Sequence, residues 1–187
     1  SRANAKVTRE VASVLAAVAK SLEADRHPAH QVGAFLTRCL FSMFAEDVGL
    51  LPASEQGKGE GKGAFSELLQ RHREHSPTLQ RMLQALWADM DRGGFSAALA
   101  REVRKFNGKL FKASQSEGYA LLLSASQIDG LLTAAKANWT EVEPAIFGTL
   151  LERALDPDER HALGAHFTPR AYVDRLVIPT VIDPLRA

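Results

Sequence analysis

The chain has 187 residues, 45% of them hydrophobic, which is enough for one domain with a core of its own, or for one domain and an appendage. Its 23 basic and 22 acidic side chains nearly cancel, which argues against a dedicated nucleic-acid-binding domain, so any contact with DNA must be local. The one cysteine, Cys39, excludes an internal disulfide and suits a reducing cytoplasm, and no apolar run approaches the ~20 residues that a membrane span needs.

Apolar residues at helical spacing predict a series of helices separated by turn residues. The first covers residues 7–22. The second, residues 31–48, has so wide an apolar stripe that we expect it to be buried on most sides, with Gly49 ending it. Further helices are predicted over residues 65–75, 78–90, 96–105, 126–137 and 144–154. Gly93-Gly94 ends the helix predicted over residues 78–90.

Two stretches between these helices are expected to be irregular. Residues 52–63, PASEQGKGEGKG, alternate four glycines with charges and predict a mobile surface loop, because they bury little apolar surface. Asn107-Gly108 favours a tight type I′ turn between apolar flanks. No internal repeat and no convincing strand pattern is found. The predicted fold class is therefore all-α: an irregular multi-helix bundle with a mobile glycine-rich loop and a C-terminal extension.

The histidines do not predict a metal site. Two pairs have the spacing of three that places both imidazoles on one helix face: His27 with His30, and His72 with His75. No neighbouring cysteine and no His-Glu-x-x-His pattern completes either pair, so the sequence favours solvated surface histidines.

Three further side chains invite a catalytic interpretation, and each has a more ordinary one. Cys39 falls on the apolar stripe of its helix, where a buried thiol packs and does not react. Glu46 and Asp47 stand at a helix C-terminus, where negative charge opposes the helix dipole. We expect them to pair with arginines of neighbouring helices and not to act as a catalytic carboxylate pair.

Basic side chains gather in residues 101–112, which include two phenylalanines and a single acid. The cations are Arg101, Arg104, Lys105, Lys109 and Lys112. Positive charge around a turn suits the phosphates of nucleic acid, but it also suits a solvated helix end. Both interpretations stay open. The candidates for contact with DNA are Arg104, Lys105, Lys109 and Lys112.

Two helix starts stand close to the end of the chain. Asp156-Pro157 begins a short helix that ends by Gly164, and Thr168-Pro169 begins another over residues 170–177. The second start presents unpaired N–H groups and the positive end of a dipole beside a hydroxyl, which suits a carboxylate or phosphate. On physical grounds alone, ordinary capping explains it as well.

The segment PAIFGTLLERALDPDERHALGAHFTPRAYVDRLVIPTVIDPLR resembles the part of large N6-adenine DNA methyltransferases that leads into their catalytic domain. These bacterial enzymes occur in single-chain restriction–modification systems (Type IIG/IIL) and in phage-defence systems of the BREX and DISARM kind. FLTRCLFSMFAEDVGLLP and FNGKLF are similar to the helical spacer domain of the same group, although Lys109 replaces a more usual Gly. The resemblance implies a helical spacer over residues 1–155 and the truncated N-terminal edge of a methyltransferase domain over residues 156–187.

GAHFTP corresponds to motif X of that family, which helps to hold S-adenosylmethionine. The resemblance implies cofactor contacts by Gly164, Ala165, Phe167, Thr168 and Pro169. Phe167 would lie against the cofactor, and Thr168 would meet its methionine carboxylate. Phe167 stands where Tyr is more usual, which removes a hydroxyl and keeps the ring.

The family's glycine-rich cofactor loop and its Asn/Asp-Pro-Pro-aromatic motif are absent from this sequence, so we expect the chain alone to be inactive, with no catalytic residue. The expected function is a cytoplasmic helical spacer that positions domains of an adenine-specific methyltransferase on double-stranded DNA. Its neighbours would be the methyltransferase domain and, where one is fused, an N-terminal nuclease domain. The start SRANAKVTRE lacks an initiator Met and is expected to belong to an excised piece. The alternative is a self-contained helical module that binds a protein partner.

Overall fold

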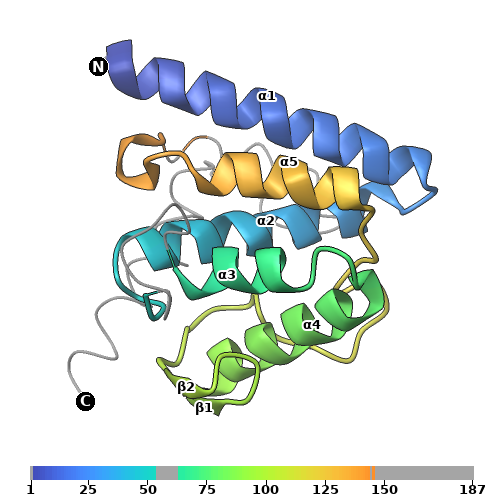
Figure 1. The fold of residues 1–187 in the computed structure, drawn as a ribbon, viewed down its shortest axis with the longest axis vertical. Coiled ribbons are helices and arrows are strands. Elements are labelled where there is room, and N and C mark those ends of the chain that lie inside the picture. The colour runs from blue at the N-terminus through green and yellow to red at the C-terminus, as the bar shows by residue number, and fades with distance from the viewer. Residues whose placement is uncertain (1, 54–62, 144, 146–187) are drawn as a thin grey trace, which may run out of the picture.

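The computed structural model describes residues 2–53, 63–143 and 145. Within this part of the chain, five α-helices, two short strands and one 3₁₀-helix (η1) follow one another (Figure 1). Their bounds are α1 Arg2–Ala24, α2 Ala29–Asp47, α3 Ala64–Arg71, α4 Ser76–Arg92, β1 Gly94–Ser96, β2 Arg101–Val103, α5 Ala125–Ala135 and η1 Trp139–Glu141. Each strand has three residues. The predicted all-α, irregular bundle is therefore confirmed.

The central helix is α2, which contacts α1, α3, α5 and η1 (Figure 1). The wide apolar stripe predicted for it is confirmed, since Phe35, Cys39 and Met43 are fully buried. Its buried hydroxyl groups are satisfied inside the bundle. Ser42 Oγ donates to the carbonyl of Arg38 (2.8 Å) and accepts from the indole N–H of Trp87 (2.9 Å). A buried polar group with its hydrogen bonds made avoids the cost of desolvation.

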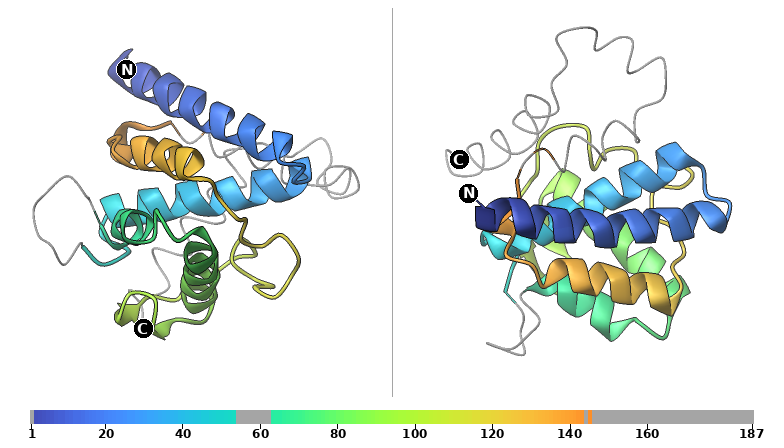
Figure 2. Two further views of the ribbon diagram at one scale, coloured as in Figure 1. Left: turned by 45° about the vertical axis from the view of Figure 1, so that its right-hand side comes forward. Right: turned by 90° about the horizontal axis from the view of Figure 1, so that it is seen from above.

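A second layer is formed by α1 and α5, which run alongside each other over α2 (Figures 1 and 2). A Cβ added at Gly130 of α5 would lie 2.6 Å from the Val18 side chain, so the missing side chain allows this close approach. Ser124 and Gln127 form a capping box at the start of α5. The Gln127 amide also donates to Ser21 Oγ of α1 at 2.9 Å, and this bond joins the two helices.

The helices predicted over residues 7–22, 31–48, 65–75, 78–90 and 126–137 are confirmed as α1 to α5. Glycines end two of them as expected: Gly49 (φ +80°) follows α2, and Gly93 (φ +78°) caps α4. The third helix is shorter than predicted because the chain turns after Arg71. No helix among the described residues has the length and hydropathy of a membrane span.

The helix predicted over residues 96–105 is wrong. Residues 94–103 form an antiparallel pair of strands, with Phe95 opposite Glu102 and Ser96 opposite Arg101. In each strand the middle residue is exposed and the last one is buried, as for Phe95 and Ser96 of β1. The physical reason lies at the end of α4, where two successive glycines with positive φ turn the chain back. The N–H of Phe106 then bonds to the carbonyl of Met90 at 2.7 Å, which fixes the strand pair beside α4.

Three predictions fall outside the described residues. They are the glycine-rich loop between Ala53 and Gly63, the helix over residues 144–154 except residue 145, and all of residues 156–187. The candidate cofactor residues Gly164, Ala165, Phe167, Thr168 and Pro169 belong to the last group, so their role stays a prediction.

Candidate nucleic-acid interface

The four candidate DNA-binding cations lie in residues 104–124, the connecting segment between β2 and α5, which has no helix or strand. Arg104, Lys105, Lys109 and Lys112 are all exposed. Among the described residues, the first three make no ion pair, and Lys112 Nζ lies 3.7 Å from Asp91 Oδ1. At this distance the contact is weak, and the exposed ammonium of Lys112 stays available to another anion.

Aromatic packing holds the connecting segment against the bundle. Phe106 and Phe111 are buried, and both rings meet Phe41 of α2 edge to face, with ring centroids 5.9 and 5.8 Å apart. The rings of Phe106 and Phe111 also contact each other at 5.9 Å. These edge-to-face contacts add to the stabilisation from apolar burial. The basic side chains therefore project from a segment whose aromatic residues belong to the core.

This packing explains why the predicted type I′ turn at Asn107-Gly108 is wrong. That turn needs positive φ at both residues, and only Gly108 has it, at +99°. The flanking apolar residues are not paired strands. They are Phe106 and Phe111, which both turn inward onto Phe41. The remaining cation of residues 101–112, Arg101, bonds elsewhere, because its Nη1 donates to the carbonyl of Ala53 at 2.7 Å.

Arg38 of α2 binds the backbone of the connecting segment at two points. Its Nε donates to the carbonyl of Leu110 and its Nη1 to the carbonyl of Tyr119, both at 2.9 Å. The guanidinium carbon also lies 4.2 Å from the centre of the Tyr119 ring, where the ring quadrupole stabilises a cation. The Tyr119 hydroxyl in turn donates to the carbonyl of Phe111 at 2.7 Å.

The sequence analysis did not single out Arg38, although a signal was present. An arginine in the middle of the apolar run FLTRCLF must find partners for its charge, because an unpaired buried charge is costly. Burial lowers the pKa of Arg38, against the opposing influence of Tyr119. The carbonyls and the ring supply the partners that the helix itself does not offer.

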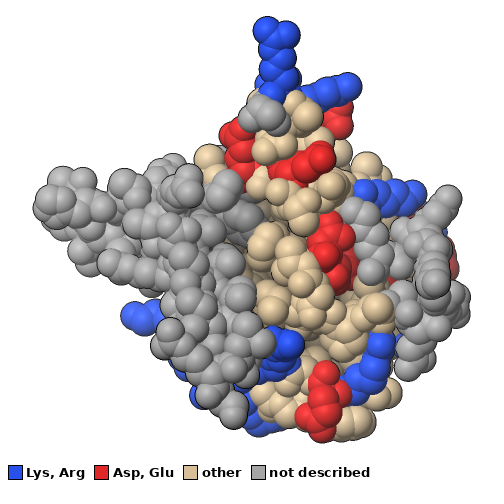
Figure 3. All heavy atoms as spheres, turned by 90° about the vertical axis from the view of Figure 1, so that its left-hand side faces the viewer, with Lys and Arg blue, Asp and Glu red and all other residues tan. Residues whose placement is uncertain are grey.

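Two glutamines of α4 bind the other side of the same segment. Gln84 Nε2 donates to the carbonyl of Ser114 at 2.6 Å, and Gln80 Nε2 donates to the carbonyl of Ala120 at 2.9 Å. The connecting segment is therefore held between α2 and α4. Over the face shown in Figure 3, acidic and basic side chains are interspersed, so the described surface there has no field of one sign.

The predicted pairing of Glu46 with an arginine is wrong. Glu46 is buried, and its Oε2 accepts from the backbone N–H of Ser66 at 3.0 Å, while its Oε1 accepts from the Ser66 hydroxyl. The carboxylate thus binds the first turn of α3, where N–H groups have no partner within the helix. Asp47 Oδ2 accepts from the backbone N–H of Trp139 at 2.8 Å. Both acids are used in joining elements of the bundle.

The other candidates for chemistry are placed as follows. Cys39 is buried, and burial raises the pKa of its thiol, which confirms that it is core packing. No group of His, Cys, Asp and Glu among the described residues is arranged to hold a metal. A cavity of about 320 Å³ lies between α3 and the β1–β2 turn, lined in part by Glu67, Arg71 and His72. Glu67 and Arg71 form an ion pair at 2.8 Å across its wall.

Comparison with known proteins shows what this part of the chain is similar to. Residues 30–111, which include Arg38, Phe41 and Phe111, match the family model described as "MmeI, helicase spacer domain". This stretch is therefore similar to a spacer domain of the MmeI type. The resemblance of FLTRCLFSMFAEDVGLLP and FNGKLF to a helical spacer is thereby confirmed, because both stretches lie within or overlap this match.

Two relatives show how the MmeI-type spacer is embedded in longer chains. DNA methyltransferase A of Bacillus subtilis (strain 168) is 24% identical over 155 residues, which are 81% of this chain and 16% of that protein. The fold is shared with the solved "Structure of Type IIL restriction-modification enzyme MmeI in complex with DNA", with a TM-score of 0.54 and 24% identity. That likeness covers 95% of this chain and 23% of the other. The chain thus spans less than a quarter of either relative.

Proposed function

We propose that this chain is the helical spacer of an adenine-specific DNA methyltransferase that belongs to a restriction–modification or phage-defence system. The observation that carries the proposal is the coverage: 95% of the chain follows part of a DNA-bound Type IIL enzyme, and 81% follows part of a DNA methyltransferase. Residues 1–155 would form the spacer, and residues 156–187 the first edge of the methyltransferase domain. The protein would act in the cytoplasm, where its DNA lies.

A spacer must fix the direction in which the chain leaves it, and the contacts around η1 suit that task. The N–H of Trp139 bonds to Asp47 of α2, and the buried indole N–H donates to the carbonyl of Ala134 at 3.1 Å. The N–H of Glu143 donates to Thr8 Oγ1 of α1 at 2.8 Å. The last described turn is therefore tied to three helices, so a domain that follows would inherit a defined orientation.

The cofactor of the whole enzyme would be S-adenosylmethionine, held in part by Gly164, Ala165, Phe167, Thr168 and Pro169. The adjacent methyltransferase domain would supply the rest of the cofactor site and the catalytic residues. A nuclease domain on the N-terminal side is a further expected partner. The spacer itself would contact the backbone of double-stranded DNA through Arg104, Lys105, Lys109 and Lys112, because lysines around a loop act as point charges that do not read bases.

Methyl transfer tests the assignment as a spacer. The intact protein is expected to transfer labelled methyl groups from S-adenosylmethionine to adenine N6 in mixed DNA, and the 187-residue chain alone is expected to show no turnover. Turnover by the purified chain would refute the proposal.

DNA binding tests the proposed interface. Changing Lys105, Lys109 and Lys112 to Ala in the intact protein should weaken binding alike across sequences, and should reduce the salt slope by roughly one unit per lost phosphate contact. The matched control removes three other exposed lysines, Lys6, Lys20 and Lys136. If DNA affinity depends on salt equally in both triple variants, the connecting segment is an ordinary solvated surface and not a DNA interface.

A further inference from the structure

Arg38 lies at the contact between FLTRCLFSMFAEDVGLLP and FNGKLF, the two stretches that resemble the spacer domain. Phe41, in the same stretch of α2 as Arg38, packs against Phe106 and Phe111, the first and last residues of FNGKLF. Arg38 itself binds the carbonyl of Leu110, inside that stretch, and the carbonyl of Tyr119 beyond it. The aromatic cluster thus holds residues 106–111, while Arg38 bonds to Leu110 near the end of that stretch and to Tyr119 beyond it.

The two halves of the connecting segment are anchored by different interactions. Phe106 and Phe111 anchor the beginning of the connecting segment through apolar burial, which does not depend on Arg38. Residues 112–118 have no such anchor, since Lys112 and Ala113 are exposed and Ala113 has a φ of +59°. Arg38 bonds to the carbonyls on either side of these residues, at Leu110 and Tyr119, and Gln84 bonds to the carbonyl of Ser114 among them.

We infer that Arg38 is a positioning residue of the proposed DNA interface. By holding the carbonyl oxygens at both ends of residues 110–119, it fixes the conformation in which Lys112, and Lys109 next to Leu110, are presented to phosphates. The inference rests on the proposed function for its use of the lysines. Only arginine suits this task, because its planar group donates in two directions and stacks on an aromatic ring at the same time.

Amide hydrogen exchange on the 187-residue chain tests the hold of Arg38 on the segment. Three amides inside it donate to local carbonyls and report its order: Lys112 to Lys109 (3.2 Å), Ser116 to Ala113 (2.9 Å) and Tyr119 to Ser116 (3.3 Å). Arg38→Met should speed exchange at these amides by about 10- to 100-fold, as expected for the loss of a hydrogen bond from a charged group. Arg38→Lys, which keeps the charge and loses the fork, should give an intermediate increase.

The control is Arg81→Met, which removes an exposed arginine of α4. It should leave the three amides unchanged. Amides in the middle of α4 and α5 report global unfolding, and they should respond little to Arg38→Met. If the three amides exchange alike in Arg38→Met and wild type, the inference is overturned.

DNA binding by the intact protein tests whether the hydrogen bonds of Arg38 support the proposed interface. Arg38→Met is expected to weaken binding, and to reduce the salt slope by at most about two units, the share of two phosphate contacts. In a Lys109→Ala/Lys112→Ala background, Arg38→Met should weaken binding no further, because it acts through those lysines. An equal additional loss in that background would overturn the positioning role.

The two proposals fail in different ways. If Lys109→Ala/Lys112→Ala binds DNA like the wild type, the interface is refuted, and with it the use of Arg38 for DNA. If that lysine variant binds weakly while Arg38→Met binds like the wild type, the interface stands and only the role of Arg38 falls.

Discussion

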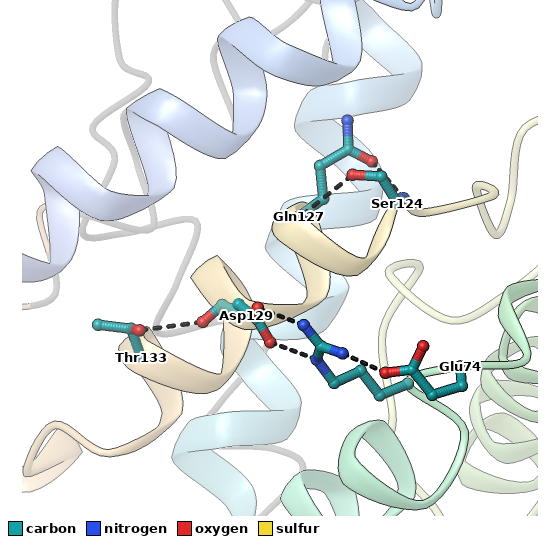
Figure 4. A network of polar contacts seen from close by, with 6 residues as sticks. Glu74, Ser124, Gln127, Asp129 and Thr133 are labelled. Atoms are coloured by element: carbon teal, nitrogen blue, oxygen red, sulfur yellow. Dashed lines mark hydrogen bonds and ion pairs between the residues drawn. The ribbon is translucent and has the colours of Figure 1, made fainter.

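The guanidinium of Arg73 meets the carboxylate of Asp129 through two parallel hydrogen bonds of 2.7 Å, which join the turn after α3 to α5. Figure 4 shows Asp129 on one side of this group and Glu74 on the other. The forked geometry is the one in which arginine and carboxylate interact most favourably. The pair links residues 56 positions apart and connects the α3 region to α5 of the second layer.

Asp129→Asn is expected to lower stability modestly at neutral pH, and the difference from wild type should vanish in acid. Hydrogen bonds from Arg73 lower the pKa of Asp129. The contribution is therefore present above the unfolded pKa, about 3.9, and is lost as the pH falls through the lower native pKa. Urea unfolding of both proteins from pH 7 downward measures it. Because both side chains are exposed, 1 M salt should shrink the difference, and a difference that persists in acid would contradict this account.

Glu46 should show the opposite pH dependence. Burial raises the pKa of Glu46 against the opposing hydrogen bonds from Ser66. The folded state then takes up a proton more readily than the unfolded state, so the contribution is fully present below the unfolded pKa, about 4.3, and is lost as the pH rises through the native pKa. Relative to Glu46→Gln, the wild type should lose stability as the pH rises above the unfolded pKa.

The same measurement on Ser66→Ala serves as a check on the cause. Removing the hydroxyl deprives the carboxylate of one hydrogen bond and should raise the native pKa of Glu46 further, which steepens the loss. Parallel pH profiles for wild type and Glu46→Gln would show that Glu46 does not titrate differently in the folded state.

Two glycines with similar φ should differ in how well they tolerate a side chain. Gly49 has φ +80° and open space around an added Cβ, so Gly49→Ala should cost about 1–2 kcal/mol for the left-handed backbone alone. Gly93 has φ +78° with ψ 163°, a region that only glycine adopts readily. An added Cβ there would lie 2.9 Å from Lys105 Cβ and 3.2 Å from its backbone, which cannot rotate away. Gly93→Ala should therefore destabilise clearly more in urea unfolding. Equal losses would mean that the contact with Lys105 relaxes freely.

Thr168→Ala tests the proposed cofactor contact in the intact protein. Loss of a capping oxygen alone would cost about 0.5–2 kcal/mol of helix stability. A contact with the methionine carboxylate would appear separately, as a raised Kd for S-adenosylmethionine in a protein that remains folded. Thr168→Ser keeps the hydroxyl and should restore most of the affinity. Calorimetric titration gives the affinities and melting curves report folding; wild-type affinity in Thr168→Ala would leave Thr168 as a cap only.

The helices were predictable because their signal is local. The apolar spacing along α1 and α2 corresponds to faces that the structure buries, including Leu15, Leu36 and Leu40. Residues 96–105 were not predictable in this way, since Ala, Leu, Arg and Lys favour a helix intrinsically. What overrides that preference is tertiary: Gly93 lies against the backbone of Lys105, and the N–H of Phe106 bonds to Met90.

The candidate interface was only half visible in the sequence. Exposed cations such as Lys105 and Lys109 follow directly from composition, because charged side chains stay on the surface. The residue that organises their segment does not. Arg38 bonds to carbonyl oxygens 72 and 81 positions away, so no spacing within its own helix reveals the partner. The carbonyl acceptors belong to the backbone and leave no trace in the sequence at all.

The pairing of α1 with α5 also sets the order in which the chain can fold during synthesis. α1 packs more extensively against α5 than against α2, its neighbour in sequence. The hydrogen bond from Gln127 to Ser21 spans 106 positions, and at ribosomal rates of about 5–20 residues per second that stretch takes roughly 5–20 s to make. Throughout that time the apolar side of α1, with Val11, Leu15 and Val18, lacks its main cover. Of the helices described here, the first to be synthesised is thus among the last to be buried, and its apolar face is where a chaperone would bind a growing chain.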